Sequence, residues 1–291
     1  MAAQFLTLRT CGQNGVWRLL EQSKAASPTA SLQGRHCRCL YTESSAATLE
    51  AKLSFTAAAE DQGARCSAVL PHEWRHDVES LALQAPLYAQ GADALLVQGL
   101  PTSALEVLAA ASSLPVCSMG NASSNPALAL ADLALMQQSH EDLSRLRVAW
   151  IGGVNGLTSS LIEAAMFVPF ELFIALPQWS EPDRDLLDLA LRAGAKVFLS
   201  HEPHMVLEGA HVVYAGLGPS AAQGTPLSGG MRLSPEAFAL ARPDAAVLTA
   251  ESLSPACYAT ESILDAAVPL WEQRLAMRRR MQALILRDLF A

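Results

Sequence analysis

One short segment has the spacing of a zinc-protease motif. The segment "HEWRH" places His72 and His76 four residues apart, with a glutamate between them. On a helix, two such histidines share one face and can ligate Zn²⁺, while the glutamate acts as a general base. Trp74 and Arg75 are not the small or aliphatic residues that the buried interior of such a helix needs. An exposed polar loop is therefore favoured over a zinc hydrolase, and no metal site is expected.

A carboxylate and a lysine stand close together in "TLEAKLSF", where Glu50 and Lys52 precede an apolar helix seam. The segment follows "HCRCLY", which has the composition of a buried strand. A strand that runs into the start of a helix is a usual place for an anion, because free N–H groups and the helix dipole attract negative charge. Glu50 is unexpected there. Beside a lysine it could act as a general acid or base.

A glycine-rich turn follows a later strand in "WIGGVNGLTSS". A strand, a glycine turn and a helix together present backbone N–H groups to an anion or a carboxylate. The spacing is not that of a dinucleotide fingerprint, and no acidic residue ends the next strand, "FELFIALP". A nicotinamide cofactor is therefore not expected, and we predict no cofactor. A tight turn that serves packing alone is the alternative.

Strands and helices alternate along the chain and must position these residues. "DALLVQGL" is a continuous apolar run suited to a buried parallel strand, and "NPALALADLALMQQSH" predicts a long helix. The pattern predicts an α/β protein with two doubly wound parallel-sheet lobes, residues 1–133 and 134–269, joined by that helix. A C-terminal helix, 270–291, is expected to return to the first lobe, with Arg278 to Arg280 on a solvated face.

Composition excludes several classes of protein. A hydrophobic content of 51% with 16% charged residues excludes disorder. The net charge of −8 argues against a nucleic-acid surface, and no apolar run is long enough to predict a membrane helix. The first residues do not read as a secretory signal. Cys37 and Cys39 face one side of a predicted strand, which favours buried free thiols and a cytoplasmic protein.

Several segments, taken in chain order, resemble the transcarbamylases, the aspartate and ornithine carbamoyltransferase family. "FLTLRT" is similar to the family's opening, and "LPVCSMGNASSNPALALADLALM" resembles its passage through His-Pro-x-Gln. "LRVAWIGGVNG" resembles the strand and Gly-Asp-x-Asn-Asn loop of its second domain, and "WEQRLAMRRRMQALIL" its closing helix. The resemblance spans nearly the whole chain. It implies a homotrimer and a small-molecule ligand, an amino acid or an acyl or carbamoyl donor, in the cleft between the lobes.

The resemblance fails at the family's Ser-Thr-Arg-Thr-Arg loop, which holds carbamoyl phosphate at a helix start. Aligned back from Ser54, the loop reads Thr48, Leu49, Glu50, Ala51, Lys52. Aligned forward from Tyr41, it reads Ser45, Ala46, Ala47, Thr48, Leu49. Both registers stay open, and neither contains an arginine. In the first register, Glu50 replaces an arginine that would touch the phosphate.

Other site positions of the family also differ. Gln98 stands for the arginine that ends the second strand, Asn125 for the histidine of His-Pro-x-Gln, and Leu128 for its glutamine. Asn155 remains from the Gly-Asp-x-Asn-Asn loop, and Gly216 stands for the later aspartate. The chain therefore resembles the family at positions that build the fold, but differs from it at positions that bind the substrates or act in catalysis.

Three functions follow from this pattern. The first is a non-catalytic homologue. The second is an enzyme of altered chemistry, in which Glu50, Lys52 and Asn125 are catalytic while Thr48, Gln98 and Asn155 bind the substrate. The third is a divergent carbamoyltransferase that acts on an amino acid, with arginines supplied from elsewhere, such as Arg75 of the partner subunit.

Overall fold

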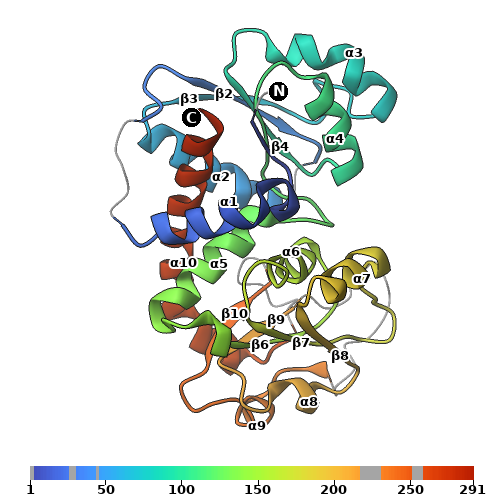
Figure 1. The fold of residues 1–291 in the computed structure, drawn as a ribbon, viewed down its shortest axis with the longest axis vertical. Helices are drawn as coiled ribbons and strands as arrows, with labels where there is room; N and C mark the ends of the chain where they lie inside the picture. The colour runs from blue at the N-terminus through green and yellow to red at the C-terminus, as the bar shows by residue number, and fades with distance from the viewer. Residues whose placement is uncertain (1–2, 26–30, 44–45, 217–230, 251–257) are drawn as a thin grey trace. The chain divides into compact units, whose positions relative to one another are not determined.

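The computed structural model describes residues 3–25, 31–43, 46–216, 231–250 and 258–291, without the side chains of 46–48. The chain forms two compact units. Unit 1 comprises Met1–Leu135 with Leu275–Ala291, and unit 2 comprises Met136–Arg274. Each unit contains a five-stranded sheet in which all neighbours run parallel, flanked by helices (Figure 1). The predicted α/β fold with two parallel sheets is confirmed.

The sheet of unit 1 has the strand order β1-β5-β4-β2-β3. Its central strand β4 is buried at every residue, because a strand covered on both faces needs a continuous apolar run. The strands are β1 (Gln4–Phe5), β2 (His36–Tyr41), β3 (Arg65–Val69), β4 (Ala94–Gln98) and β5 (Val116–Ser118).

Helices surround this sheet, as the alternating pattern predicts. The helices are α1 (Leu8–Gln22), α2 (Ala46–Asp61), α3 (Val78–Ala89), α4 (Thr102–Ala111), the first part of α5 (Pro126–Ser139) and the last part of α10 (Glu261–Leu289). Proline suits the first position of α5, because the first N–H groups of a helix have no intrahelical partner. Helix α10 starts at Glu261, earlier than the sequence indicated.

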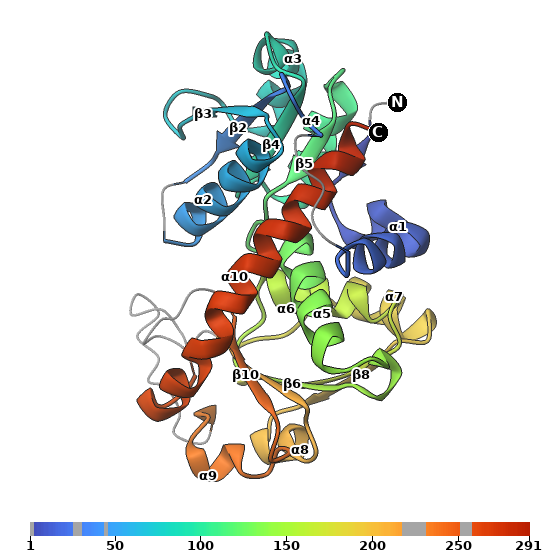
Figure 2. The ribbon, with the colours of Figure 1, turned by 90° about the vertical axis from the view of Figure 1, so that its left-hand side faces the viewer.

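Within unit 1, the last part of α10 lies beside α1 and α2 (Figure 2). Gln282 donates to the hydroxyl of Ser54 on α2 at 3.0 Å. Asp288 forms an ion pair with Arg18 on α1 at 2.7 Å. The last part of α10, from Leu275, is therefore an integral part of unit 1.

Unit 2 has the strand order β10-β9-β6-β7-β8. The chain starts at the central β6, adds β7 and β8 on one side, then crosses over to add β9 and β10 on the other. The strand order reverses between β6 and β9, which is the topology of a doubly wound sheet. The strands are β6 (Arg147–Ile151), β7 (Glu171–Ala175), β8 (Lys196–Ser200), β9 (Val212–Ala215) and β10 (Ala246–Thr249).

The helical elements of unit 2 are shorter than the helices of unit 1, and α6 is buried along its whole length. They are η1 (Leu143–Arg145), α6 (Gly156–Ala164), α7 (Arg184–Arg192), α8 (Pro203–Leu207) and α9 (Pro235–Phe238). Across the described part of the chain, no helix is long and apolar enough to cross a membrane.

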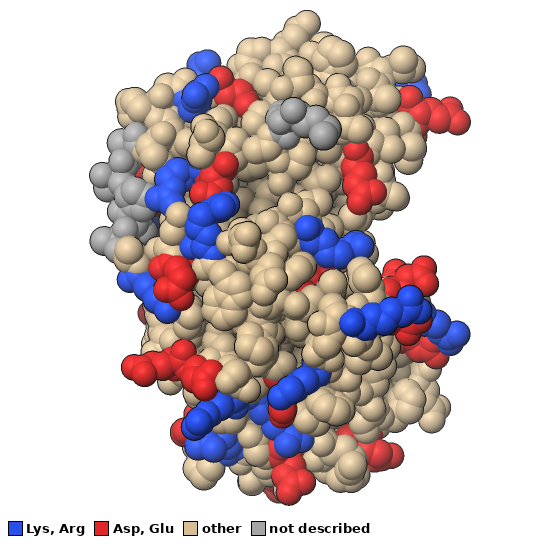
Figure 3. Space-filling model, in the orientation of Figure 1, with Lys and Arg blue, Asp and Glu red and all other residues tan. Residues whose placement is uncertain are grey.

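The described cysteines are free thiols, as the sequence predicts. Cys37 on β2 lies directly opposite Cys66 on β3, and Cys39 is buried one pleat further along. Cys117 on β5 is also buried, and this burial raises the pKa of its thiol. On the face shown in Figure 3, basic and acidic side chains are interspersed.

Candidate functional site

In unit 1, the carboxyl ends of β2 and β4 bring two predicted site elements together. Tyr41 and Gln98 are direct partners across the two strands. Gln98 is 7% exposed, and its side-chain oxygen is buried without a hydrogen-bond partner among the described residues. An unmet buried acceptor carries a desolvation cost of about 1–3 kcal/mol. The Gln98 amide is therefore available to a donor that enters at this edge of the sheet.

Lys52 on α2 lies over the same strand end. Its ammonium nitrogen is 5.4 Å from the centre of the Tyr41 ring, a cation–π distance. Lys52 is half-buried and forms no ion pair with a described residue. Burial is the main cause that raises the pKa of the Tyr41 hydroxyl, so this phenol stays neutral beside the lysine.

Asn125 is joined to this group through two glycines. The N–H of Gly99, the residue after Gln98, donates to the carbonyl of Gly120 at 2.9 Å. Gly120 has φ +106°, and a Cβ there would come within 3.0 Å of the Asn125 amide. Glycine is required at this position both for the backbone conformation and for the approach of Asn125. Lys52, Gln98 and Asn125 thus lie around one edge of the sheet of unit 1.

Glu50 has a partner that the sequence analysis missed. It forms an ion pair with Arg278 of α10. The Arg278 side chain is 5% exposed and that of Glu50 is 17% exposed. The expectation that Arg278 lies on a solvated face is therefore wrong, although Arg279 beside it is exposed and pairs with Asp61. Glu50 is held by a buried cation within unit 1.

A signal for this contact is present in the helical period of the sequence. Positions three and four apart share one face of a helix. Arg278 stands three residues before Met281 and seven before Ile285, and all three are buried. An apolar stripe that includes an arginine predicts a buried guanidinium, and such a group needs an acidic partner.

The side chain of Thr48 lies outside the described part of the structure. Residue 45, the first position of the second register of the loop, is also outside it. The structure describes Leu49 as 55% exposed and Leu128 as 4% exposed, so the two apolar residues of this region differ in burial.

In unit 2, Asn155 forms the N-cap of α6. Its side-chain oxygen accepts hydrogen bonds from the N–H groups of Leu157 at 3.0 Å and Thr158 at 3.1 Å. The Thr158 hydroxyl accepts from the Asn155 N–H in return, which completes a capping box. The N–H groups that would otherwise meet an anion are thereby partly satisfied by the chain itself.

The glycine turn before Asn155 is covered by the segment that follows β7. A Cβ at Gly153 would come within 2.6 Å of the Trp179 ring. The Ser180 hydroxyl accepts a hydrogen bond from the Val154 N–H at 2.9 Å. These contacts support the alternative that the turn serves packing.

The "HEWRH" segment lies in the loop between β3 and α3, not on a helix. His72 and His76 are exposed, whereas Trp74 is 6% exposed and its indole N–H donates to the Tyr41 carbonyl at 2.8 Å. The loop is therefore anchored by its tryptophan and lacks the helical geometry of the zinc motif. Among the described residues, no group of three or more His, Cys, Asp or Glu side chains could hold a metal ion.

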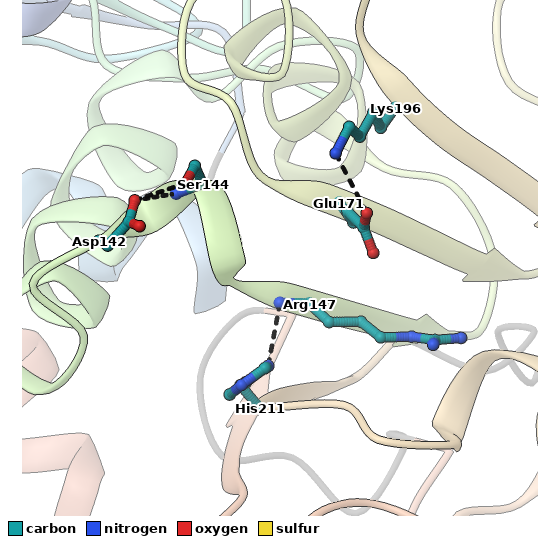
Figure 4. A network of polar contacts seen from close by, with 6 residues as sticks. All are labelled: Asp142, Ser144, Arg147, Glu171, Lys196 and His211. Atoms are coloured by element: carbon teal, nitrogen blue, oxygen red, sulfur yellow. Dashed lines mark hydrogen bonds and ion pairs between the residues drawn. The ribbon is translucent and has the colours of Figure 1, made fainter.

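A second polar network lies at the amino ends of the strands of unit 2 (Figure 4). The Arg147 N–H donates to His211 Nδ1 at 3.1 Å, and Lys196 pairs with Glu171 at 3.2 Å. Burial, followed by nearby Arg242, lowers the pKa of His211. Ligands of open α/β sheets bind outside the carboxyl ends of the strands, so this network is structural.

Known proteins similar to this chain are carbamoyltransferases. The ornithine carbamoyltransferase of Nitratidesulfovibrio vulgaris (strain DP4) is 36% identical over 218 residues, covering 73% of this chain and 72% of that protein. The ornithine carbamoyltransferase of Oleidesulfovibrio alaskensis is 32% identical over the same shares of both chains. No model of a protein family matches the chain.

Solved structures agree on the fold. The ornithine carbamoyltransferase from Pyrococcus furiosus matches with a TM-score of 0.87 at 20% identity, over 98% of this chain and 96% of that one. The enzyme from Thermus thermophilus matches with a TM-score of 0.84 at 21% identity, over 99% of both chains. With its two parallel sheets and its sequence identity to these relatives, the chain belongs to the ornithine carbamoyltransferase family.

Proposed function

We propose that this protein is a non-catalytic member of its family, which does not transfer a carbamoyl group from carbamoyl phosphate. The observation that carries the proposal is the ion pair between Glu50 and buried Arg278. In the first register, Glu50 occupies the position of a phosphate-binding arginine. A carboxylate that is already neutralised by the chain's own guanidinium leaves no net cation there for a doubly charged donor.

Electrostatic magnitudes support this proposal. Two unit charges about 4 Å apart interact by roughly 4 kcal/mol at an intermediate dielectric. A neutral ion pair in place of a free arginine removes that gain. Lys52 offsets part of it, but as a point charge without the bidentate fork of an arginine. Losing one preorganised donor already lowers catalysis by about a hundredfold or more.

The polar groups that remain favour a ligand of lower charge. Lys52 supplies one cation, the Gln98 amide supplies an unmet acceptor, and Asn125 supplies an amide held against Gly120. An amino acid or another small carboxylate suits this set better than a phosphorylated donor. Retention of the fold for binding such a ligand is the role we propose.

Binding and turnover measurements test the proposal. Carbamoyl phosphate is titrated into the purified protein by calorimetry, and citrulline formation is followed with ornithine present. The ornithine carbamoyltransferase of Nitratidesulfovibrio vulgaris, measured in parallel, is the positive control. We expect saturable binding and citrulline only with the control enzyme. Citrulline formed by this protein at a comparable turnover would refute the proposal.

A gain-of-charge variant sharpens this test. Glu50→Arg combined with Arg278→Gln places a guanidinium at position 50 without setting two arginines against each other. We expect measurable carbamoyl phosphate binding in this variant, because one cation of the anion site is restored. Arg278→Gln alone is the matched control, and it should not bind.

A second candidate is an active ornithine carbamoyltransferase, which the 36% identity to a relative of that name favours. In this case Lys52 and a guanidinium from elsewhere would bind the donor. The turnover measurement above distinguishes the two candidates directly.

We also propose that the protein is a homotrimer and that it is located in the cytoplasm. The free buried thiols fit a reducing compartment. Exposed apolar side chains on α3 fit an assembly, since large exposed apolar residues often mark interfaces. These residues are Val78 at 52%, Leu83 at 83% and Leu87 at 57% exposure.

A further inference from the structure

A cavity in unit 2 lies next to the glycine turn that precedes Asn155, and Ser180 contributes to both. It has a volume of about 250 Å³ and lies at the carboxyl ends of β7 and β8, next to the start of α7. The carboxyl edge of an open α/β sheet is where ligands bind in such folds. Four of its nine lining residues are apolar: Leu176, Pro182, Leu187 and Leu199.

One polar residue in the cavity wall is His201, an exposed histidine whose ring is hydrogen-bonded to the backbone. Its Nδ1 lies 2.8 Å from the Leu176 carbonyl. A carbonyl only accepts, so Nδ1 carries the proton and donates to it. In the neutral imidazole, Nε2 is then an acceptor, and it has no partner among the described residues. His201 therefore presents a hydrogen-bond acceptor to a ligand.

A second polar group is Ser180, which is 7% exposed. Its oxygen accepts from the Val154 N–H, and its hydroxyl hydrogen has no acceptor among the described residues. Ser200, also in the wall, has its hydroxyl engaged with the backbone of Glu202. The cavity thus combines an acceptor on His201 with a donor on Ser180.

The charges at the rim cancel each other. Arg184 and Glu181 form an ion pair at 3.0 Å, with side chains 85% and 65% exposed. No uncompensated cation selects an anionic ligand. The neighbouring glycine turn is covered by Trp179, which leaves no open phosphate cradle beside the cavity.

From these contacts we propose that unit 2 carries a binding site for a neutral, amino-substituted heteroaromatic ring of the nucleobase class. Typical drug-sized pockets occupy about 300–1,000 Å³, so a cavity of 250 Å³ suits a single ring system and not a dinucleotide. The leucines contact the ring, its amino group donates to His201 Nε2, and a ring nitrogen accepts from Ser180.

A matched pair of ligands tests the polar contact. The probes are 9-methyladenine and 9-methylpurine, which differ only in the amino group. Binding is followed by methyl NMR of protein labelled at leucine, which also reports on folding. The protein should bind 9-methyladenine, a ligand of about ten heavy atoms, with a dissociation constant of about 1 mM. The amino-free probe should bind about fivefold more weakly, the effect of one hydrogen bond.

Variants localise the site. His201→Ala should weaken 9-methyladenine about fivefold and leave 9-methylpurine unchanged. His204→Ala, an exposed histidine outside the cavity wall, is the control and should change neither. Leu187→Trp should fill the cavity and abolish binding, whereas Leu189→Trp, on an exposed position of the same helix, should not.

The proposal is overturned if the leucine methyl signals of the cavity wall do not shift at about 10 mM probe. Binding that survives Leu187→Trp, or equal affinity for the two probes, also overturns it. These outcomes do not depend on whether the protein binds carbamoyl phosphate, because every residue involved lies in unit 2.

Discussion

At the scale of single residues, the partner of a charged group decides what it can do. Glu50 and Lys52 stand two residues apart on α2, yet their surroundings differ. Glu50 faces a guanidinium with 5% exposure, whereas Lys52 faces the ring of Tyr41 and keeps its charge available. The lysine is therefore the better candidate for contact with a ligand, and the glutamate has a structural partner.

Removing the Glu50 charge should destabilise unit 1. Glu50→Gln keeps the shape of the side chain but removes the negative charge that pairs with buried Arg278, so we expect a loss of about 3 kcal/mol in unfolding free energy. Denaturant titration followed by circular dichroism measures it. Asp61→Asn, which breaks the exposed pair with Arg279, is the matched control and should cost under about 1 kcal/mol. Equal losses would contradict the buried pair.

At the scale of elements, the start of α6 shows how a site residue can serve the fold. Asn155 caps the helix with two accepted hydrogen bonds, and Trp179 and Ser180 close the turn in front of it. The strand, turn and helix arrangement was predictable. The segment that covers the turn was not, because Trp179 belongs to a connection after a different strand.

A cap role and a ligand role for Asn155 predict different variant behaviour. Asn155→Ala should lower the unfolding free energy by about 1 kcal/mol, since it leaves N–H groups of α6 unmet. Asn155→Ser should retain most of the stability, because serine also caps helices. Thermal and denaturant unfolding provide the measurement. Full stability in the alanine variant would show that the cap contributes nothing.

The pH dependence of stability provides a test at the amino ends of the unit 2 strands. His211 is packed near His140, Arg147, Arg242 and Asp244, and its pKa is lowered from 6.5. The unfolded state therefore binds the proton more readily. The contribution of His211 to the free energy of unfolding is present above pH 6.5. It is lost as the pH falls through the lower pKa that this histidine has in the folded state.

We expect the wild-type protein to lose stability between about pH 7 and pH 5 more steeply than His211→Gln. Unfolding free energies measured across this range give the difference directly. His204→Gln, which changes an exposed histidine, should follow the wild-type profile. Parallel profiles for the wild type and His211→Gln would rule out this contribution.

At the scale of the whole molecule, each unit has its own sheet and core, and unit 1 includes the end of the chain. Residues of α10 contact α1 and α2 through ion pairs and hydrogen bonds. Residues separated by more than 200 positions thus complete one unit. Stability of unit 1 therefore depends on residues 275–291.

Deleting residues 275–291 should therefore unfold unit 1 selectively. Hydrogen exchange followed by mass spectrometry should show lost protection in β2, β3 and α2. Protection in β6, β7 and β9 should remain, since the strands of unit 2 pair only with one another among the described residues. Uniform loss of protection across both units would contradict this division.

Assembly through α3 gives another prediction at this scale. Leu83→Glu places a charge on the most exposed leucine of that helix, so light scattering coupled to size exclusion should show a smaller species than the wild type. Leu240→Glu, at an exposed position of unit 2, is the control and should leave the mass unchanged. A monomeric wild-type protein would refute the trimer.

Sequence patterns predicted the fold well because parallel strands and their helices carry local signals. The apolar run "ALLV" forms most of the fully buried β4, and Asn125 and Pro126 mark the start of α5. The candidate site was less predictable. The Glu50 contact joins positions 228 apart, and no local period reports which acidic residue a buried arginine meets.

The ion pair between Glu50 and Arg278 also bears on how the protein could change over generations. An arginine introduced at position 50 by itself would face Arg278, and repulsion between two cations would weaken the fold. Arg278 replaced first would leave Glu50 without its partner. Placing an arginine at position 50 therefore requires two coordinated changes, and this epistasis makes the change hard to reach by single steps.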